Sequence, residues 1–268
     1  MNAEYYAEII KASKKYGNIC PETIIRIVRS EIGKFNSEKD AVKSVKTKLH
    51  KITGAFLGEE RIRQAYKLLE SLSENTADEL IYKILALHAS SAERMTFTKE
   101  MYKDIFSVTG AEGPILDIAC GFNPFCIPLM PEPAQNKYRA TEINVKITEL
   151  LNRFFALTGS SACAYATDII YTIPDFYTHN VFLFKTLPLL EQQQKGYSKI
   201  LIDRLDSEFF SITFPTKTLS GKNVGMYKFY NEFMENCFAK NEFEYCLQKE
   251  YFNEILYIIR RKKALILY

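Results

Sequence analysis

Residues 113–125 of this 268-residue chain read GPILDIACGFNPF, and this stretch decides the fold. Apolar residues on both sides of Asp117 predict a short buried strand over 115–119. The Cys-Gly and Asn-Pro pairs that follow predict a tight turn. A glycine after the first strand of an open α/β sheet lets the backbone approach a ligand closely, at the crevice beyond the carboxyl ends of the strands. We therefore expect Asp117 and Gly121 to lie at a ligand-binding crevice.

Downstream of residue 111, apolar and β-branched runs alternate with stretches of helical periodicity, which is typical of an α/β sheet. The predicted strands are 115–119, 138–142, 162–167, 181–185, 208–214, 245–251 and 255–260, and the helices are 146–157, 189–205 and 226–240. Three residues separate the last two strands, which leaves no room for a helix and predicts an antiparallel hairpin after a parallel set. Seven strands ending in such a hairpin resemble the Rossmann-like layout of class I S-adenosylmethionine (SAM) methyltransferases.

The N-terminal part of the chain shows helical periodicity throughout and no convincing strand. Its predicted helices are 2–14, 21–32, 38–55, 59–72, 76–88 and 91–106. Val42, Val45, Leu49 and Ile52 recur at helical spacing and are expected to form the buried stripe of the third helix. The change from helical periodicity to alternating strand and helix patterns predicts an all-helical domain over 1–108 and an α/β domain over 109–268.

Positive charge gathers at the start of the chain. The net charge is only +3, but residues 1–51 hold 11 Lys and Arg against 6 Asp and Glu. Lys39, Lys43, Lys46 and His50 share one exposed face of the third predicted helix, where like charges repel unless they meet an anion. A basic face of this kind favours phosphate binding, although a solvated helix face is the alternative interpretation.

Other features of the sequence exclude several classes of protein. The six cysteines are scattered, without a C-x-x-C pair or a histidine at zinc spacing, so we expect neither a disulfide framework nor a metal site. The N-terminus lacks a signal-peptide pattern, and no apolar run approaches the length of a membrane span. We therefore expect a cytoplasmic protein with reduced thiols and no contact with membranes.

Carboxylates follow successive predicted strands, at the edge where parallel strands converge. Glu142 ends the second strand, where its carboxylate can accept both hydroxyls of a ribose. Asp168 follows the third strand and can accept from an adenine amino group, while Ile169 packs on the ring. Lys185 ends the fourth strand beneath the same crevice. Each carboxylate alone is more often a helix cap or a surface charge, but their ordered appearance favours a SAM site.

Several segments resemble the aminoglycoside-resistance 16S rRNA (guanine(1405)-N7)-methyltransferases over essentially the whole chain. The resembling segments are SKKY (13–16), CPETIIRIV (20–28), TKLHKITGAF (47–56), LHASSAERM (87–95), LDIACGFNPF (116–125), LFKTLPLLE (183–191) and ITFPTKTLSGKNVGM (212–226). LHASSAER, DIACGFNP and FPTKTLSGxxxGM are distinctive of that family rather than of methyltransferases in general.

The resemblance implies SAM as cofactor and, as target, N7 of guanine 1405 in the decoding-site helix of 16S rRNA within the assembled 30S subunit. It also implies resistance to 4,6-disubstituted deoxystreptamine aminoglycosides. Arg94 would bind the methionine carboxylate of SAM. The residues implied around the methionine, ribose and adenine are Asp117, Gly121, Glu142, Asp168, Ile169 and Lys185.

The same resemblance implies residues for the RNA substrate. Lys185, Lys217 and Met226 would lie around the target base as the catalytic set, with Lys217 also contacting rRNA. Lys15, Lys46 and Arg26 would contact rRNA phosphates. Tyr227 stands where the family usually has Glu. If that acid shapes the base pocket, Tyr227 changes the local geometry, although its aromatic ring could stack on a flipped base.

The chemistry agrees with the target that the resemblance implies. N7 of guanine has a free lone pair, so its methylation requires alignment with the sulfonium methyl more than a general base. The sequence offers no obvious base at the expected place. Two alternatives stay open: a catalytically impaired homologue that only binds 30S, and a methyltransferase that acts on another RNA nucleotide.

Overall fold

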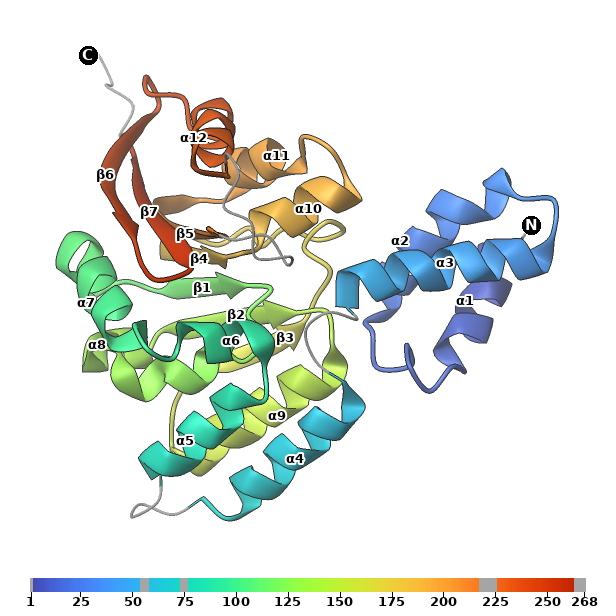
Figure 1. Cartoon of the computed structure of the whole chain (residues 1–268), viewed down its shortest axis with the longest axis horizontal. Helices are drawn as coiled ribbons and strands as arrows, with labels where there is room; N and C mark the ends of the chain where they lie inside the picture. Colours follow the sequence, from blue (N-terminus) through green and yellow to red (C-terminus); the bar gives the residue numbers. More distant parts are fainter. Residues whose placement is uncertain (1, 54–57, 73–76, 217–225, 263–268) are drawn as a thin grey trace.

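The computed structural model describes residues 2–53, 58–72, 77–216 and 226–262, and within them a seven-stranded sheet lies between layers of helices (Figure 1). The strand order is β3-β2-β1-β4-β5-β7-β6. The strands are β1 (Ile115–Ile118), β2 (Tyr138–Glu142), β3 (Cys163–Ala166), β4 (Thr178–Phe184), β5 (Ser207–Pro215), β6 (Phe243–Glu250) and β7 (Glu254–Arg261). β1 to β5 pair in parallel, and β7 pairs antiparallel with both β5 and β6. The predicted α/β class and C-terminal hairpin are confirmed.

The described helices cover the N-terminal third of the chain and the connections of the sheet. The N-terminal ones are α1 (Ala3–Lys11), α2 (Pro21–Glu31), η1 (Ile32–Lys34), α3 (Glu38–Thr53), α4 (Glu59–Glu70), α5 (Ala77–Ala86), α6 (Ala89–Arg94) and α7 (Thr98–Thr109). The later ones are η3 (Asn123–Leu129), α8 (Glu132–Gln135), α9 (Val145–Leu157), α10 (Leu187–Gln193), α11 (Tyr197–Arg204) and α12 (Met226–Cys237).

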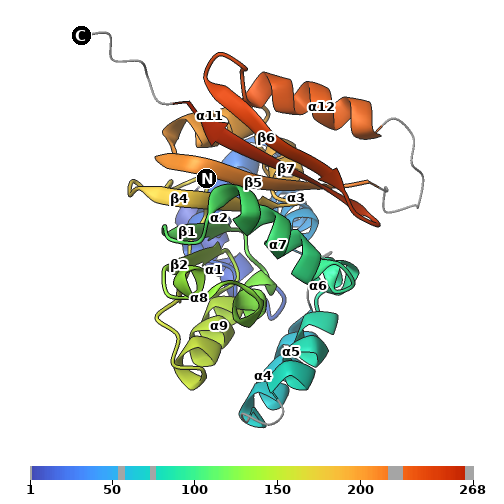
Figure 2. The ribbon, with the colours of Figure 1, turned by 90° about the vertical axis from the view of Figure 1, so that its left-hand side faces the viewer.

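Alternation along the central strands divides their side chains between two cores. Ile115 of β1 and Phe182 of β4 lie in the core shared with α4, α5, α7 and α9. Leu116 and Val181, the neighbours of these residues, lie in the core shared with α10, α11 and α12. The two groups of helices therefore cover opposite faces of the sheet (Figure 2).

Helices α1, α2 and α3 form a separate lobe with its own apolar core. In α3, Val45 and Leu49 are fully buried, with Val42 and Ile52 packed against the same core, so the predicted stripe is confirmed. Helices α4, α5 and α7 instead share a core with the sheet. The domain boundary predicted after residue 108 stays a prediction, while side-chain packing separates α1–α3 from the rest of the chain.

Three local predictions were wrong or incomplete. The single helix predicted over 91–106 is two helices, α6 and α7, with a turn over 95–97 between them. The single helix predicted over 189–205 is two helices, α10 and α11, because Gly196 adopts a left-handed conformation with φ of 79° between them. Glu191 accepts hydrogen bonds from the backbone N–H groups of Gly196 and Ser198 and so holds this break. The turn predicted after β1 continues into the 3-10 helix η3.

No helix in the described ranges is both long and apolar enough to cross a membrane.

Replacement of Phe182 by alanine tests the central core. Phe182 is fully buried and packs against the rings of Tyr138, Tyr102 and Phe184. We expect Phe182→Ala to lower the free energy of unfolding by about 3–5 kcal/mol, because the cavity removes both buried area and contacts. Urea denaturation measures this change. Phe229→Ala, at a residue that is 60% exposed, is the control, and equal effects of the two changes would contradict this packing.

Candidate cofactor and active site

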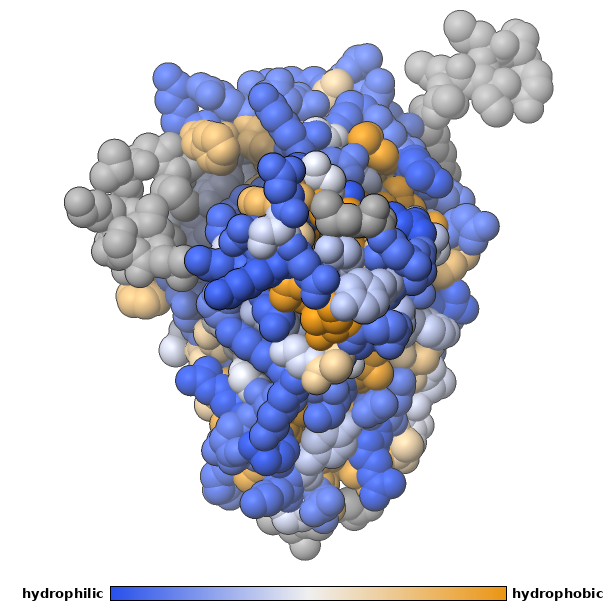
Figure 3. Space-filling view, turned by 90° about the vertical axis from the view of Figure 1, so that its right-hand side faces the viewer, coloured by the Kyte–Doolittle hydropathy of each residue, from blue (hydrophilic) through white to orange (hydrophobic). Residues whose placement is uncertain are grey.

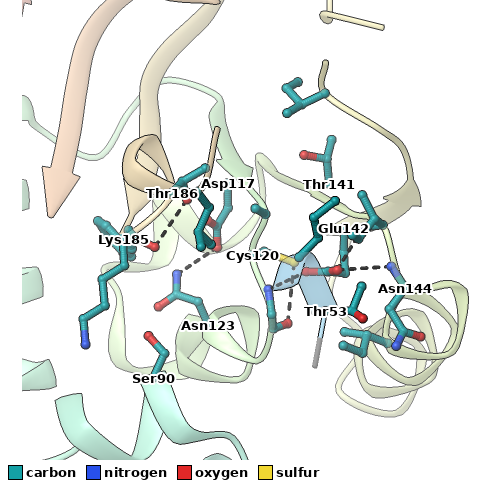
Figure 4. Close-up of a pocket in the computed structure, with 18 of the residues that line it drawn as sticks. Thr53, Ser90, Asp117, Cys120, Asn123, Thr141, Glu142, Asn144, Lys185 and Thr186 are labelled. Atoms are coloured by element: carbon teal, nitrogen blue, oxygen red, sulfur yellow. Dashed lines mark hydrogen bonds between the residues drawn. The ribbon is translucent and has the colours of Figure 1, made fainter. Parts of the chain in front are cut away.

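A pocket lies at the carboxyl ends of β1, β2, β3 and β4, where the sequence predicted a crevice (Figure 4). It is open to solvent, and its walls combine the strand ends with residues of α2, α3, α6 and α10. Its lining includes every residue of the predicted cofactor set: Arg94, Asp117, Gly121, Glu142, Asp168, Ile169 and Lys185. The structure therefore brings this set together, and the roles of its members toward a cofactor stay predictions.

The backbone turns sharply where the two central strands reach the pocket. Ala119 after β1 and Lys185 after β4 have positive φ angles of 54° and 57°, which non-glycine residues rarely adopt. Gly121 also has a positive φ, and a Cβ atom there would lie 2.9 Å from Cε1 of His88. Only glycine fits at position 121, and strain in two neighbouring strand ends is typical of a functional site.

Asp117 lies at the base of the pocket, 1% exposed. Its Oδ2 accepts hydrogen bonds from Tyr138 Oη at 2.5 Å and from Asn123 Nδ2 at 2.8 Å. Burial raises the pKa of Asp117 to about 6, against the opposing effect of these two donors and of Arg94. The carboxylate is thus ionised at neutral pH and can attract a cationic group of a ligand.

Glu142 is held by backbone donors at the end of β2 (Figure 4). One carboxylate oxygen accepts from Gly121 N at 3.1 Å, and the other accepts from Ile143 N at 2.9 Å and Asn144 N at 3.1 Å. Burial raises the pKa of Glu142, and the three N–H groups oppose that rise. A carboxylate fixed in this way presents its remaining lone pairs to ligand hydroxyl groups.

Asp168 and Ile169 follow β3 and are both nearly fully buried in the pocket wall. Asp168 Oδ1 accepts from Ile170 N at 2.9 Å. Asp168 Oδ2 accepts from Arg26 Nε at 2.7 Å. The carboxylate is therefore locked in orientation from two sides.

Arg94 lines the pocket and has a partner that sequence analysis missed. Its Nη2 and Nε atoms contact Glu254 Oε1 at 2.7 and 3.1 Å, and its Nη1 donates to Asn123 at 3.3 Å. Burial disfavours the charged form of both side chains. Their mutual attraction outweighs this penalty, so the pKa of Arg94 is raised and the pKa of Glu254 is lowered. Both side chains are at most 4% exposed, which makes this a buried ion pair.

Lys185 is tied to the same cluster. Its Nζ lies 2.7 Å from Glu93 Oε2 and 3.4 Å from Glu254 Oε2. Glu254 therefore lies between Arg94 and Lys185, and its single charge serves two cations. No local motif indicates this role, because Glu254 stands in the C-terminal hairpin and far from both cations in the sequence.

The role of His88 also depends on the fold. Its Nδ1 accepts from Ser91 N and caps α6, while its ring lies against Gly121 and stacks on Phe122. Burial, together with the positive charges of Arg94, Lys185 and Arg61, lowers the pKa of His88 to about 4. The imidazole is neutral at physiological pH and serves as a packing and capping group.

The predicted RNA-contacting residues fall into three groups. Lys15 and Lys46 lie on the surface of the α1–α3 lobe, and Lys15 Nζ is 3.2 Å from His50 Nδ1. Arg26 differs from them, because its side chain is 19% exposed and pairs with Asp168 in the pocket wall, and its contact with phosphates stays a prediction. Lys217 and the side chains of Met226 and Tyr227 lie outside the described residues.

The pocket residues fit SAM. Asp117, Glu142 and Asp168 are carboxylates that could accept from the ammonium, ribose hydroxyl and adenine amino groups of SAM, and Arg94 could donate to its carboxylate. Buried Thr141 Oγ1, in the same wall, has no hydrogen-bond partner among the described residues, as expected of a group that a ligand completes. Across the described ranges, no three His, Cys, Asp or Glu residues gather as a metal site would require.

The fold and this pocket define a class I SAM-dependent methyltransferase. A family model described as ribosomal RNA methyltransferase (FmrO) matches residues 12–258. The chain therefore belongs to the FmrO family of ribosomal RNA methyltransferases.

Individual relatives match over nearly the whole chain. A 16S rRNA (guanine(1405)-N(7))-methyltransferase of Serratia marcescens is 31% identical, covering 97% of this chain and 99% of that protein. One of the same name from Frankia casuarinae is 30% identical over 95% and 92% of the two chains. The crystal structure of the 16S rRNA methyltransferase RmtF in complex with S-adenosyl-L-homocysteine (SAH) is similar, with a TM-score of 0.88 and 28% identity over 98% and 100% of the chains.

Glu254→Gln tests the buried ion pair. The change leaves Arg94 and Lys185 as buried or partly buried cations without their shared anion, so we expect the free energy of unfolding to fall by about 3 kcal/mol. Urea denaturation measures the loss. Glu79→Gln, which removes the exposed partner of Lys83, is the control and should leave the denaturation midpoint unchanged. A Glu254→Gln protein as stable as wild type would contradict this account.

Asp117→Asn tests the pH dependence of cofactor binding. Because the pKa of Asp117 is about 6, protonation removes its attraction for the cofactor's ammonium group as the pH falls. We expect SAH affinity, measured by calorimetry, to fall about tenfold from pH 7 to pH 5, since one proton is taken up over that interval. Asp117→Asn should bind more weakly at pH 7 and lose this pH dependence. An unchanged pH profile in the variant would exclude Asp117 as its source.

Proposed function

We propose that this enzyme transfers the methyl group of SAM to N7 of guanine 1405 in 16S rRNA, with the assembled 30S subunit as substrate. One observation carries the proposal: relatives named for this reaction match across the α1–α3 lobe as well as the pocket, over 95% or more of this chain. A methyltransferase for a small molecule would not need that basic lobe.

The pocket residues align the reactants. SAM would supply a methyl group on a sulfonium: the N7 lone pair of guanine would form the N–CH3 bond as the S–CH3 bond breaks and SAH leaves, with no prior deprotonation. Arg94, Glu142 and Asp168 would hold the methionine, ribose and adenine parts, which fixes the position of the methyl group. Alignment of this kind can contribute several kcal/mol to lowering the barrier, on the order of 7–11 in favourable cases. The neutral His88 is not required as a base.

Lys185 is suited to orient the target base. An ammonium group has three hydrogens, and in this structure one is donated to Glu93 Oε2 at 2.7 Å, while Glu254 Oε2 lies 3.4 Å away without accepting a hydrogen bond. A remaining hydrogen can donate to O6 of guanine, beside N7 on the same edge of the base. A base in an RNA helix must first leave the stack to reach this position.

The α1–α3 lobe would bind the rRNA backbone. Hydrophilic side chains cover most of the face on which the lobe lies (Figure 3). Its lysines without an acidic partner within 4.0 Å, among the residues that the structure describes, are Lys14, Lys15, Lys39, Lys43, Lys46 and Lys51. Lysines without an acidic partner are available to neutralise phosphates and release counterions.

The product explains a resistance phenotype. Methylation at N7 gives guanine a fixed positive charge and removes a hydrogen-bond acceptor from its major-groove edge. A polycationic 4,6-disubstituted deoxystreptamine aminoglycoside would lose a hydrogen bond there and meet repulsion. Action on 30S subunits would place the enzyme in the cytoplasm.

Methyl transfer from tritiated SAM to purified unmethylated 30S subunits tests the proposal, with the modified base mapped by borohydride–aniline cleavage. We expect cleavage at guanine 1405. Label at another nucleotide would retain the enzyme class and overturn the target and the resistance. An absence of label from an enzyme that binds SAM and 30S would favour an impaired homologue that only binds the subunit.

The double variant Lys15→Glu with Lys46→Glu tests the docking face. We expect at least about tenfold weaker 30S binding, and a slope of log K against log salt reduced by about 2, because two phosphate contacts are lost. SAH affinity should stay at the wild-type value. Lys103→Glu with Lys137→Glu, at two exposed lysines outside the lobe, is the matched control. Equal 30S binding by both double variants would contradict the assignment.

A further inference from the structure

The α1–α3 lobe is joined to the cofactor pocket by the backbone. Cys20 N donates to Ile143 O at 2.7 Å, and Val145 N donates to Asn18 O at 2.8 Å. These bonds form an isolated antiparallel bridge between Ile19 and Asn144. The segment that leads into α2 is therefore fixed to the residues directly after Glu142.

A side chain makes a second connection. Arg26 of α2 donates from Nε to Asp168 Oδ2 at 2.7 Å and from Nη2 to Gln193 Oε1 at 2.8 Å. Gln193 is the last residue of α10, and Asp168 follows β3, so one guanidinium connects the lobe with two parts of the pocket wall. Only 19% of the Arg26 side chain is exposed.

Arg26 also lines the pocket itself, together with Ile52 and Thr53 of α3. Two of its five N–H donors are used by Asp168 and Gln193, which leaves three donors and the flat face of the guanidinium. A guanidinium plane is suited to pack against an aromatic ring such as adenine. The lobe thus contributes wall to the part of the pocket that Asp168 and Ile169 form.

We propose that Arg26 is a cofactor-binding residue supplied by the docking lobe, and that it couples cofactor binding to the position of that lobe. The proposal rests on the proposed function in taking Asp168 as the adenine end of a SAM site. Arg26 fixes the Asp168 carboxylate and completes the wall around the adenine. A bound cofactor then stabilises the placement of α2, and by linkage a lobe fixed on rRNA strengthens cofactor binding.

Cofactor affinity in the free enzyme tests whether Arg26 is a cofactor-binding residue. We expect Arg26→Ala to weaken SAH binding by at least tenfold in calorimetry, because Asp168 loses its partner and the adenine loses part of its wall. Arg26→Lys keeps the charge but cannot bond to Asp168 and Gln193 together, so its affinity should be intermediate. Arg29→Ala is the control on the same helix, since Arg29 is 59% exposed and pairs with the exposed Glu4. SAH affinity equal to wild type in both Arg26 variants would overturn the proposal.

Hydrogen exchange tests the coupling, because a merely structural arginine would not make the protection of α2 depend on ligand. In the wild type, saturating SAH should slow exchange of the amides of α2. The slowing in α2 should disappear in Arg26→Lys at saturating SAH, while protection around Glu142 persists. Equal slowing of α2 in the wild type and the variant, or none in either, would overturn the coupling.

These two measurements use only the free enzyme and SAH, so their outcome does not depend on the RNA substrate. A wild-type enzyme that fails to methylate 30S would defeat the proposed function and leave the Arg26 results valid. Unchanged SAH binding in the Arg26 variants, with guanine 1405 methylated, would defeat this inference alone.

Discussion

The site depends on one buried carboxylate, Glu254, which lies between Arg94 and Lys185. Burial of any one of these charges alone would be costly, and the mutual attraction of the cluster is what allows it at the pocket edge. Because Glu254 begins β7, the antiparallel hairpin delivers an anion to the carboxyl ends of the parallel strands. The fold thus supplies, from its last two strands, the group that orients the cation expected to bind the cofactor's carboxylate.

Features set by local sequence could be predicted. Asp117 lies within β1, Glu142 ends β2 and Asp168 follows β3, and parallel strands bring their carboxyl ends to one edge. The predicted strands agree with the observed ones to within three residues. The buried stripe of α3 followed from its helical period in the same way.

Features that depend on distant pairing could not be predicted. Glu254 meets Arg94 across 160 positions of the chain, and Arg26 meets Asp168 across 142. The family resemblance assigned Arg26 to phosphate, and the folded lobe shows that its guanidinium pairs with Asp168 in the pocket wall. The break at Gly196 was missed because the apolar positions on both sides of it continue a helical pattern. The pocket is consequently a product of lobe and sheet together.

A crystal structure of the enzyme with SAH tests the central claim, that this pocket is the cofactor site and that lobe and sheet build it jointly. The account predicts the SAH carboxylate on Arg94, the ribose hydroxyls on Glu142, and the adenine between Ile169 and the guanidinium of Arg26 with its amino group at Asp168. An SAH molecule bound elsewhere, or one whose adenine contacts neither Asp168 nor Arg26, would contradict it.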